Sequence, residues 1–325
     1  IKYDAKKIDS ILKKYRNFEN KADCIVPLSG GRDSCLALHL AKKKFNLNPI
    51  AYTYDWGLVT DLARRNISRM CSMLNVENII FADDIEKKRS FIKKNVLAWL
   101  KKPHLGMVNL FTAGDKHFFR HVHTVKKRTG LKLDLWGINP YEVTHFKSGF
   151  LGIPPEFELK DVYTPGVFKQ FSYHYKRFTQ MIINPSYFNS SIFDNLHGEI
   201  YRSILKKYDH YSIFDFHKWN ESEVDEVLKI YEWEKSEDTK STWRIGDGAA
   251  AFYNYIYYTM AGFSEHDTFR SNQIREGDIG REEALKLVNV ENKPRYQNIK
   301  WFLQILDIDF ENAVNAINKN KLINF

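Results

Sequence analysis

Cysteine is scarce in this chain, and its three copies lie far apart, at Cys24, Cys35 and Cys71. Three thiols cannot build a disulfide framework, and no Cys-x-x-Cys pair is present for a structural zinc ion. Because most iron–sulfur clusters need three or four cysteine thiolates, cluster chemistry and sulfur transfer are disfavoured too. We expect all three cysteines to be small core residues.

Long apolar runs are also missing. No window of about 18 uninterrupted apolar residues occurs, so a membrane span is not expected. Residues 1–9 contain no apolar h-region and no cleavage pattern, which favours a cytoplasmic protein. The sequence begins at Ile1 rather than at an initiator Met, and we therefore expect an upstream segment. With 43% hydrophobic and 27% charged residues in 325, the chain has enough apolar content to fold.

Acidic residues are fewer than basic ones. Lys and Arg total 49 and Asp and Glu total 40, which gives a formal net charge of +9. An excess of this size indicates an anionic partner. Charge alone does not choose among a nucleotide, a nucleic acid and a membrane surface.

The first half of the chain alternates strand and helix patterns. Short apolar runs predict strands at residues 22–28, 49–54, 77–82 and 131–138. Apolar residues at helical spacing predict helices at residues 4–18, 33–45, 60–74, 85–100 and 113–128. Strands separated by helices of this length predict an α/β fold with a doubly wound parallel sheet.

The pattern changes near residue 148. A segment containing glycine and proline, residues 148–166, reads as a loop or linker. Helical patterns then follow at residues 172–183, 197–208, 222–234, 248–260, 281–288, 298–305 and 309–320. We therefore expect an N-terminal helix in 1–21, an α/β domain in 22–165 and a mainly helical substrate or partner domain in 166–325.

The segment with the clearest chemistry leaves the first predicted strand and opens the next helix. It reads Pro27-Leu28-Ser29-Gly30-Gly31-Arg32-Asp33-Ser34. The glycines allow a tight turn and close approach of the backbone, and the N–H groups at a helix start favour an anion. The serine hydroxyls add donors, the arginine adds positive charge, and the aspartate can hold a magnesium ion. Together these groups suit a pyrophosphate.

This loop resembles the SGGxDS motif of the PP-loop ATP pyrophosphatases, whose fold is the adenine-nucleotide alpha-hydrolase-like type. The resemblance implies ATP and Mg²⁺ as cofactors, with residues 27–34 at the phosphates and Asp33 at the metal. It also implies release of AMP and pyrophosphate after an oxygen attacks the α-phosphorus. The Walker A pattern is absent, so cleavage between the β and γ phosphates is not implied.

Ligands of open α/β sheets lie at the carboxyl ends of the strands. The resemblance places adenine near Tyr54-Asp55-Trp56-Gly57, after the second strand. The fourth strand ends in Trp136-Gly137-Ile138-Asn139-Pro140-Tyr141-Glu142. We expect Gly137 at the nucleotide and Asn139 and Glu142 at the substrate, because polar groups just past an apolar strand belong to ligand contacts.

Distal segments carry a second resemblance, to the N-acetyl sugar amidotransferases of surface-polysaccharide, lipopolysaccharide and flagellin-glycan biosynthesis. Its residues are Tyr231-Glu232-Trp233-Glu234, Lys240-Ser241-Thr242-Trp243-Arg244-Ile245-Gly246, Gly280-Arg281-Glu282-Glu283-Ala284-Leu285 and the fourth-strand end, Trp136 to Pro140. The resemblance implies that an N-acetyl sugar, nucleotide-linked or acidic, becomes an acetamidino sugar at the expense of ATP and ammonia. Where relatives tend to have a Cys-His pair, this chain has Pro103-His104, and we expect His104 at the substrate.

Two basic residues of the second motif, Lys240 and Arg244, lie four apart, hence on one face if that segment is helical. We predict that they act in catalysis by neutralising the triphosphate or the sugar's diphosphate. A solvated basic pair is the alternative.

Partners follow from what the chain omits. No domain that could hold a Cys-His glutaminase fits before residue 22, so ammonia would come from a separate subunit or from solution. A homo-oligomer is compatible with the sequence. The phosphate loop accounts for a local need for positive charge, which makes nucleic acid a less favoured partner.

Alternatives remain open. One is a tRNA-modifying PP-loop enzyme of the lysidine or thiolation type, which the +9 charge favours. Another is a catalytically silent nucleotide-binding module. His117 and His121 have the i, i+4 spacing of metal ligands, but Phe118 stands where a zincin has glutamate, so core or solvated histidines are expected.

Overall fold

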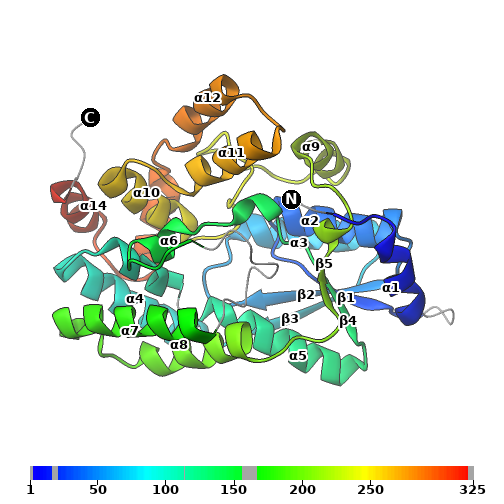
Figure 1. Cartoon of the computed structure of the whole chain (residues 1–325), viewed down its shortest axis with the longest axis horizontal. Helices are drawn as coiled ribbons and strands as arrows, with labels where there is room; N and C mark the ends of the chain where they lie inside the picture. The colour runs from blue at the N-terminus through cyan, green and yellow to red at the C-terminus, as the bar shows by residue number, and fades with distance from the viewer. Residues whose placement is uncertain (1–2, 17–20, 113, 156–166, 321–325) are drawn as a thin grey trace.

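The computed structural model describes residues 3–16, 21–112, 114–155 and 167–320, and its centre is a five-stranded parallel sheet (Figure 1). The strand order is β3-β2-β1-β4-β5, and each pair of neighbours is parallel. The strands are β1 (Cys24–Pro27), β2 (Pro49–Asp55), β3 (Asn78–Ala82), β4 (Leu133–Trp136) and β5 (His210–Ser212). The predicted doubly wound α/β class is confirmed.

Helices cover both faces of this sheet. They are α1 (Lys7–Tyr15), α2 (Arg32–His39), α3 (Asp61–Leu74), α4 (Ile85–Lys101), α5 (Phe118–Thr129), α6 (Phe146–Gly149), α7 (Val167–Ile183), α8 (Ser191–Glu199), α9 (Glu221–Ile230), α10 (Ala250–Ala261), α11 (Glu265–Glu276), α12 (Arg281–Glu291), α13 (Tyr296–Ile305) and α14 (Phe310–Lys319). A 3₁₀ segment, η2 (Leu105–Thr112), follows α4, and a π-helical segment, η6 (Ile200–Ile204), extends α8. No described helix has the length and apolar character of a membrane span.

Alternation along β1 divides the core in two. Successive strand side chains point to opposite faces. Ile25 packs into a core shared with α4, α5, α10 and α13, while Cys24 and Val26 pack into a second core with α1, α2, α3 and α9. In Figure 1 the α2 and α3 helices accordingly lie on one side of the strands and α5, α7 and α8 on the other.

Local signals explain where the elements near the sheet edge begin. Thr60 caps α3, its Oγ1 accepting a hydrogen bond of 3.2 Å from the Ala63 N–H, as its sequence position predicts. Asp84 caps α4 in the same way, through the Lys87 N–H. These two caps fix the starts of the helices that follow β2 and β3.

Several elements, among them the short helix α6, were not anticipated. Strand β5 comes from the half expected to be mainly helical, and it completes the sheet beside β4. Helix α11 was missed as well. The division at residue 165 stays a prediction, and most of the predicted linker, residues 156–166, lies outside the described residues, as do residues 17–20 after the first helix and residue 113.

Candidate active site

A cleft of about 730 Å³ opens at the carboxyl ends of β1, β2 and β4. The strand order reverses between β1 and β4, which is the switch point where open α/β sheets bind ligands. Its volume falls in the range of small-molecule sites, roughly 300–1,000 Å³. We call residues 27–34 the predicted phosphate loop, and five of them line the cleft: Ser29, Gly31, Arg32, Asp33 and Ser34.

The phosphate loop is held closed by its own hydroxyls. Ser34 Oγ lies 3.0 Å from Ser29 Oγ, accepts the Ser29 N–H at 3.1 Å and donates to the Gly31 carbonyl. Gly30 has φ +78°, and a Cβ there would come within 2.3 Å of the Ala63 carbonyl oxygen, so only glycine fits. The loop backbone therefore packs against α3 at Gly30, while Ser29, Gly31 and Ser34 line the cleft.

Only one carboxylate oxygen of Asp33 accepts hydrogen bonds from the described residues. Its Oδ1 accepts hydrogen bonds from the indole of Trp219 at 2.6 Å and the amide of Asn139 at 3.2 Å. Among the described residues Oδ2 accepts none, and Arg32 Nε lies 3.6 Å away. Because magnesium is commonly held by one or two carboxylates plus substrate phosphates, an oriented carboxylate that lines the cleft fits that ion.

Arg32 lines the cleft, but its guanidinium is bound to side chains of the protein. Its Nη1 donates to Glu221 at 2.9 Å and to Thr242 at 3.1 Å, and its guanidinium stacks on the rings of Trp219 and Phe269. The side chain is only 1% exposed. The positive charge predicted beside the loop is therefore paired with Glu221 inside the protein.

The loop after β4 packs onto the phosphate loop. A Cβ on Gly137 would lie 2.5 Å from the Asp33 carbonyl oxygen, so this contact requires glycine. Asn139 is 1% exposed and divides its amide between Asp33 and the Tyr141 N–H. Asn139 lines the cleft, and its visible task is to orient Asp33.

A charged cluster built on Arg244 forms the wall opposite the loop. Arg244 Nη2 lies 3.5 Å from Glu142, Nη1 4.0 Å from Asp247 and Nε 3.7 Å from Glu265. Lys147 pairs with Glu265. Arg244 also has φ +56°, a left-handed conformation that costs a non-glycine residue free energy.

Electrostatics in this cluster shift several groups. Burial raises the pKa of Glu142, with Arg244 opposing it, and burial likewise raises the pKa of Asp247. Burial alone would raise the pKa of Glu265, but the charges of Lys147 and Arg244 lower it to about 2. Such opposed shifts in neighbouring carboxyls are typical of functional sites.

The two sides of the cleft touch directly. Gly246, in the second motif, would place a Cβ 3.6 Å from the Ser29 carbonyl and 3.7 Å from the Gly31 nitrogen. The Gly248 N–H donates to the Leu58 carbonyl at 3.0 Å. The Trp243 indole donates to Glu142, so the motif is joined to the β4 loop as well.

The residues at the end of β2 and just after it do not all line the cleft. Tyr54 and Trp56 line the cleft, and the Tyr54 hydroxyl donates to Asp83 at 2.7 Å. Asp55 does not line it, because its carboxylate accepts the Gly57 N–H and pairs with Arg64. Asp55 therefore shapes the turn next to the predicted adenine position.

Six predicted site residues do not line the cleft: Pro27, Leu28, Gly30, Asp55, His104 and Lys240. The segment around Lys240 is not helical, so Lys240 and Arg244 do not share a helical face, and Lys240 is exposed outside the cleft lining. The His104 Nδ1 accepts the Gly106 N–H at 3.1 Å and also lies outside it.

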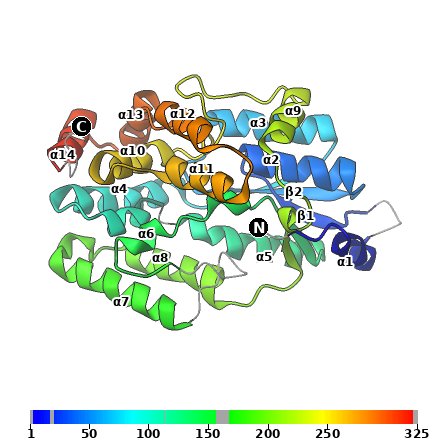
Figure 2. The same cartoon turned by 45° about the horizontal axis from the view of Figure 1, so that its top comes forward.

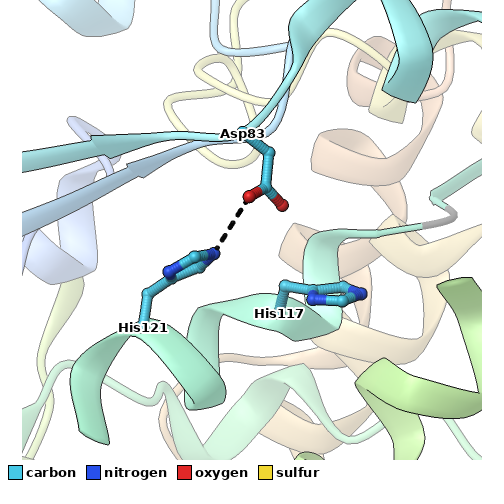
Figure 3. A group of neighbouring side chains, drawn as sticks. All are labelled: Asp83, His117 and His121. Atoms are coloured by element: carbon cyan, nitrogen blue, oxygen red, sulfur yellow. Dashed lines mark ion pairs between the residues drawn. The ribbon is translucent and has the colours of Figure 1, made fainter. Parts of the chain in front are cut away.

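A second buried polar cluster lies under the cleft, behind Tyr54. Asp83, at the end of β3, points at His121, and His117 lies beside it at the start of α5 (Figure 3). Lys88 forms ion pairs with two carboxylates of this cluster, its Nζ lying 3.2 Å from Asp83 and 2.6 Å from Asp194. The histidine spacing noted in the sequence thus belongs to an ion-paired core cluster.

All three cysteines are buried. Burial raises the pKa of the Cys24 and Cys35 thiols well above the ordinary value, and raises that of Cys71 to about 11. None of them lines the cleft. Buried thiols with raised pKa are poor nucleophiles.

Several site residues escaped the sequence. Trp219 lies in a stretch without a motif, and only the tertiary structure brings it to Asp33. Lys147 and Glu265 likewise carry no pattern. Asp247 directly follows the quoted segment Lys240 to Gly246, and its place three residues after Arg244 was the available clue.

Comparisons with known proteins give limited likenesses. No protein-family model matches this chain. A stretch of 79 residues, 24% of this chain, is 34% identical to an uncharacterized protein of Methanocaldococcus jannaschii and spans 28% of that protein's length. An NMN synthetase from Francisella tularensis aligns with 99% of this chain and 96% of its own at a TM-score of 0.41 and 12% identity. The function therefore has to be argued from the geometry of the cleft.

Proposed function

We propose that this protein is an ATP-dependent amidotransferase that forms AMP and pyrophosphate. In the proposed reaction the carbonyl oxygen of a sugar's N-acetyl group attacks the α-phosphorus of ATP, and pyrophosphate leaves. Ammonia then adds to the activated carbon, AMP departs with the former carbonyl oxygen, and an acetamidino sugar remains. The sugar is nucleotide-linked or acidic.

The observation that carries the proposal is the closed loop at the switch point with its oriented aspartate. Ser29, Gly31 and Ser34 line the cleft, and the hydrogen bonds of Trp219 and Asn139 both go to Asp33 Oδ1, not to Oδ2. Asp33 would hold Mg²⁺, which neutralises phosphate charge when bound. The chain's own contribution is to position the phosphates with fixed donors.

The charge of the cleft supports a role for the metal. Six basic residues line the cleft against five acidic ones: Arg32, Lys116, Lys147, Lys169, Arg202 and Arg244 against Asp33, Asp115, Glu142, Glu199 and Asp247. Because the charge of Arg32 is already paired with Glu221, the other lining side chains supply formally no net positive charge for a triphosphate. The remaining neutralisation falls to backbone N–H groups and Mg²⁺.

The Arg244 cluster would bind the sugar. Arg244, Glu142 and Asp247 present donors and acceptors to the cleft, and Tyr253 and Tyr257 add aromatic surface. Because three carboxylates already surround Arg244, its guanidinium is held in place before a ligand arrives. Lys240 and His104 take no part in this assignment.

The test is a product assay. Protein, ATP, Mg²⁺ and ammonium are incubated with N-acetylated sugars and sugar nucleotides, and nucleotides are separated by chromatography. Formation of AMP and pyrophosphate that depends on one sugar supports the proposal, and ADP with phosphate refutes it. Asp33→Asn should abolish turnover, while Asp61→Asn, an exposed residue of α3, should not.

The ammonia source is tested in the same assay. We propose that a separate glutaminase subunit or free ammonia supplies nitrogen, since the three cysteines are buried and none lines the cleft. Ammonium should support turnover while glutamine alone should not. Turnover with glutamine alone would contradict this assignment.

A tRNA-modifying enzyme remains the second candidate, because the chain's net charge of +9 greatly exceeds that of the cleft lining. A tRNA ligand predicts affinity that falls steeply with salt, with a slope set by the phosphates contacted. Filter binding of bulk tRNA at several salt concentrations measures that slope. Weak binding would favour the sugar substrate.

A further inference from the structure

Helix α7 presents an unpartnered apolar stripe. Five of its exposed large side chains form this stripe: Phe168, Phe171, Tyr175, Phe178 and Ile182, which are 91%, 72%, 60%, 50% and 57% exposed. Their spacing alternates between three and four residues over two heptads. That is the a/d spacing of a helix that packs along another helix.

Helix α8 with its extension η6 repeats the pattern. Phe193, Leu196, Ile200 and Ile204 are 79%, 44%, 40% and 70% exposed, again at spacings of three and four. The two helices follow each other through a short connection and lie side by side on the outside of the molecule, away from α11 and α12 (Figures 1 and 2). We call these nine residues the α7–α8 seam.

The seam is too large for an ordinary free surface. At roughly 150–250 Å² for each fully exposed large aromatic side chain, its five aromatic members alone expose roughly 500–900 Å². The largest apolar patch of a typical monomer covers about 300–600 Å². A standard protein interface buries about 800 Å² on each partner, so the seam matches one half of such an interface.

The chemistry of the seam favours self-association. The positions that flank the α7 stripe are Ser172, His174, Thr179 and Met181, none of them acidic or basic at neutral pH except the titratable histidine. Burial lowers the pKa of His174, which keeps it neutral. A two-fold axis along the α7 stripe would thus bring apolar side chains together without opposing like charges from these flanking positions, and two helix pairs would form a four-helix bundle.

The opposite face of α7 belongs to the cleft. Lys169, Gln170 and Tyr173 line it, and Asn109 lies within hydrogen-bonding distance of the Tyr173 hydroxyl, at 3.4 Å. One helix therefore has the cleft on one side and the seam on the other. Covering the seam would fix α7 and, with it, this wall of the cleft.

We propose that the α7–α8 seam is the interface of a two-fold homodimer, occupied by the same seam of a second copy. The proposal stands on exposure, spacing and charge, and does not depend on the reaction proposed above. A further consequence is that dimer formation orders one wall of the cleft.

Sedimentation equilibrium of the full chain tests it. The wild type should be dimeric at micromolar concentration. Phe171→Glu and Phe178→Glu should each weaken association by roughly 30-fold or more, as expected at central interface positions. The matched control is Leu285→Glu, a 53% exposed leucine of α12, which should stay dimeric.

A cross-linking variant keeps the proposal testable if the charged variants fail to fold. The native cysteines are buried, so a cysteine introduced at the seam is the accessible thiol. Variants with Phe178→Cys, Tyr175→Cys or Phe171→Cys should include at least one that forms a dimeric disulfide under mild oxidation, while Leu285→Cys should not. The proposal is overturned if the wild type stays monomeric, even if the protein binds anionic lipid vesicles. It is also overturned if the wild type is dimeric and the seam substitutions leave the dimer intact.

Discussion

The indole N–H of Trp219 donates a hydrogen bond of 2.6 Å to Asp33 Oδ1, joining residues 186 positions apart. Asn139 donates to the same oxygen from the β4 loop. Three separate segments thus meet at one carboxylate. The consequence is an Asp33 side chain held in place through Oδ1, while Oδ2 lies 3.6 Å from Arg32 Nε.

Trp219→Phe should slow turnover while the fold is kept. The substitution retains most of the aromatic packing and removes the donor to Asp33, and a hydrogen bond to a charged group is worth about 1.5–3 kcal/mol. We expect kcat/KM for ATP to fall by roughly 10- to 100-fold. Steady-state kinetics with magnesium titration measures the loss and any rise in the magnesium requirement.

The matched control is Trp99→Phe. Trp99 is also buried, and its indole donates at 3.0 Å to the His104 carbonyl, away from the cleft. It should lose stability without a specific change in the magnesium requirement. Equal kinetic effects of the two substitutions would contradict an orienting role for Trp219.

Gly137→Ala should distort the phosphate loop. Its new Cβ would lie 2.5 Å from the Asp33 carbonyl oxygen, so α2 or the β4 loop must move. We expect destabilisation of about 1–3 kcal/mol and weaker ATP binding. Gly149→Ala is the control, because a Cβ there meets no atom within 4 Å. Calorimetric titration with a non-hydrolysable ATP analogue measures the affinity. Binding by Gly137→Ala as tight as that of the wild type would contradict the prediction.

Arg244→Ala and Arg244→Gly separate two properties of Arg244. Both remove the ion pairs to Glu142, Asp247 and Glu265, so both should destabilise the protein. Only glycine adopts φ +56° without cost, so Arg244→Gly should be the more stable of the two by about 1 kcal/mol. Denaturant unfolding at neutral pH measures the difference. An alanine variant as stable as the glycine variant would show that the backbone is not strained.

Acid sensitivity should depend on Glu265. Its folded pKa of about 2 lies below the ordinary 4.5, so the carboxylate stabilises the fold above pH 4.5, and this stabilisation is lost as pH falls toward 2. Glu265→Gln should cost roughly 2–4 kcal/mol at pH 7. The variant should also show a shallower loss of stability between pH 4.5 and 2.

The control for the acid limb is Glu283→Gln, at an exposed position of α12. It should reproduce the wild-type dependence of unfolding free energy on pH. If Glu265→Gln and the wild type lose stability in parallel over this range, the paired state of Glu265 is not what stabilises the fold.

Particular residues show how far local pattern reaches. Thr60 caps α3, and its residue type and place before the helix indicate this, because a cap needs only the residues that follow it. Lys240 and Arg244 would share a face only if their segment were helical, and that segment forms turns instead. Strand β5 was missed, since three residues are too few to show a period of two.

The sequence by itself determined the parallel α/β sheet, the phosphate loop and the glycines that this loop requires. Each depends on near neighbours along the chain: apolar runs, caps and backbone freedom. Tertiary structure alone decided that Trp219 and Asn139 orient Asp33, that Glu221 takes the charge of Arg32 and that the α7 stripe lies uncovered. Those outcomes depend on contacts between residues far apart in the chain, and hydrophobic period and local propensity carry no information about which distant side chains meet.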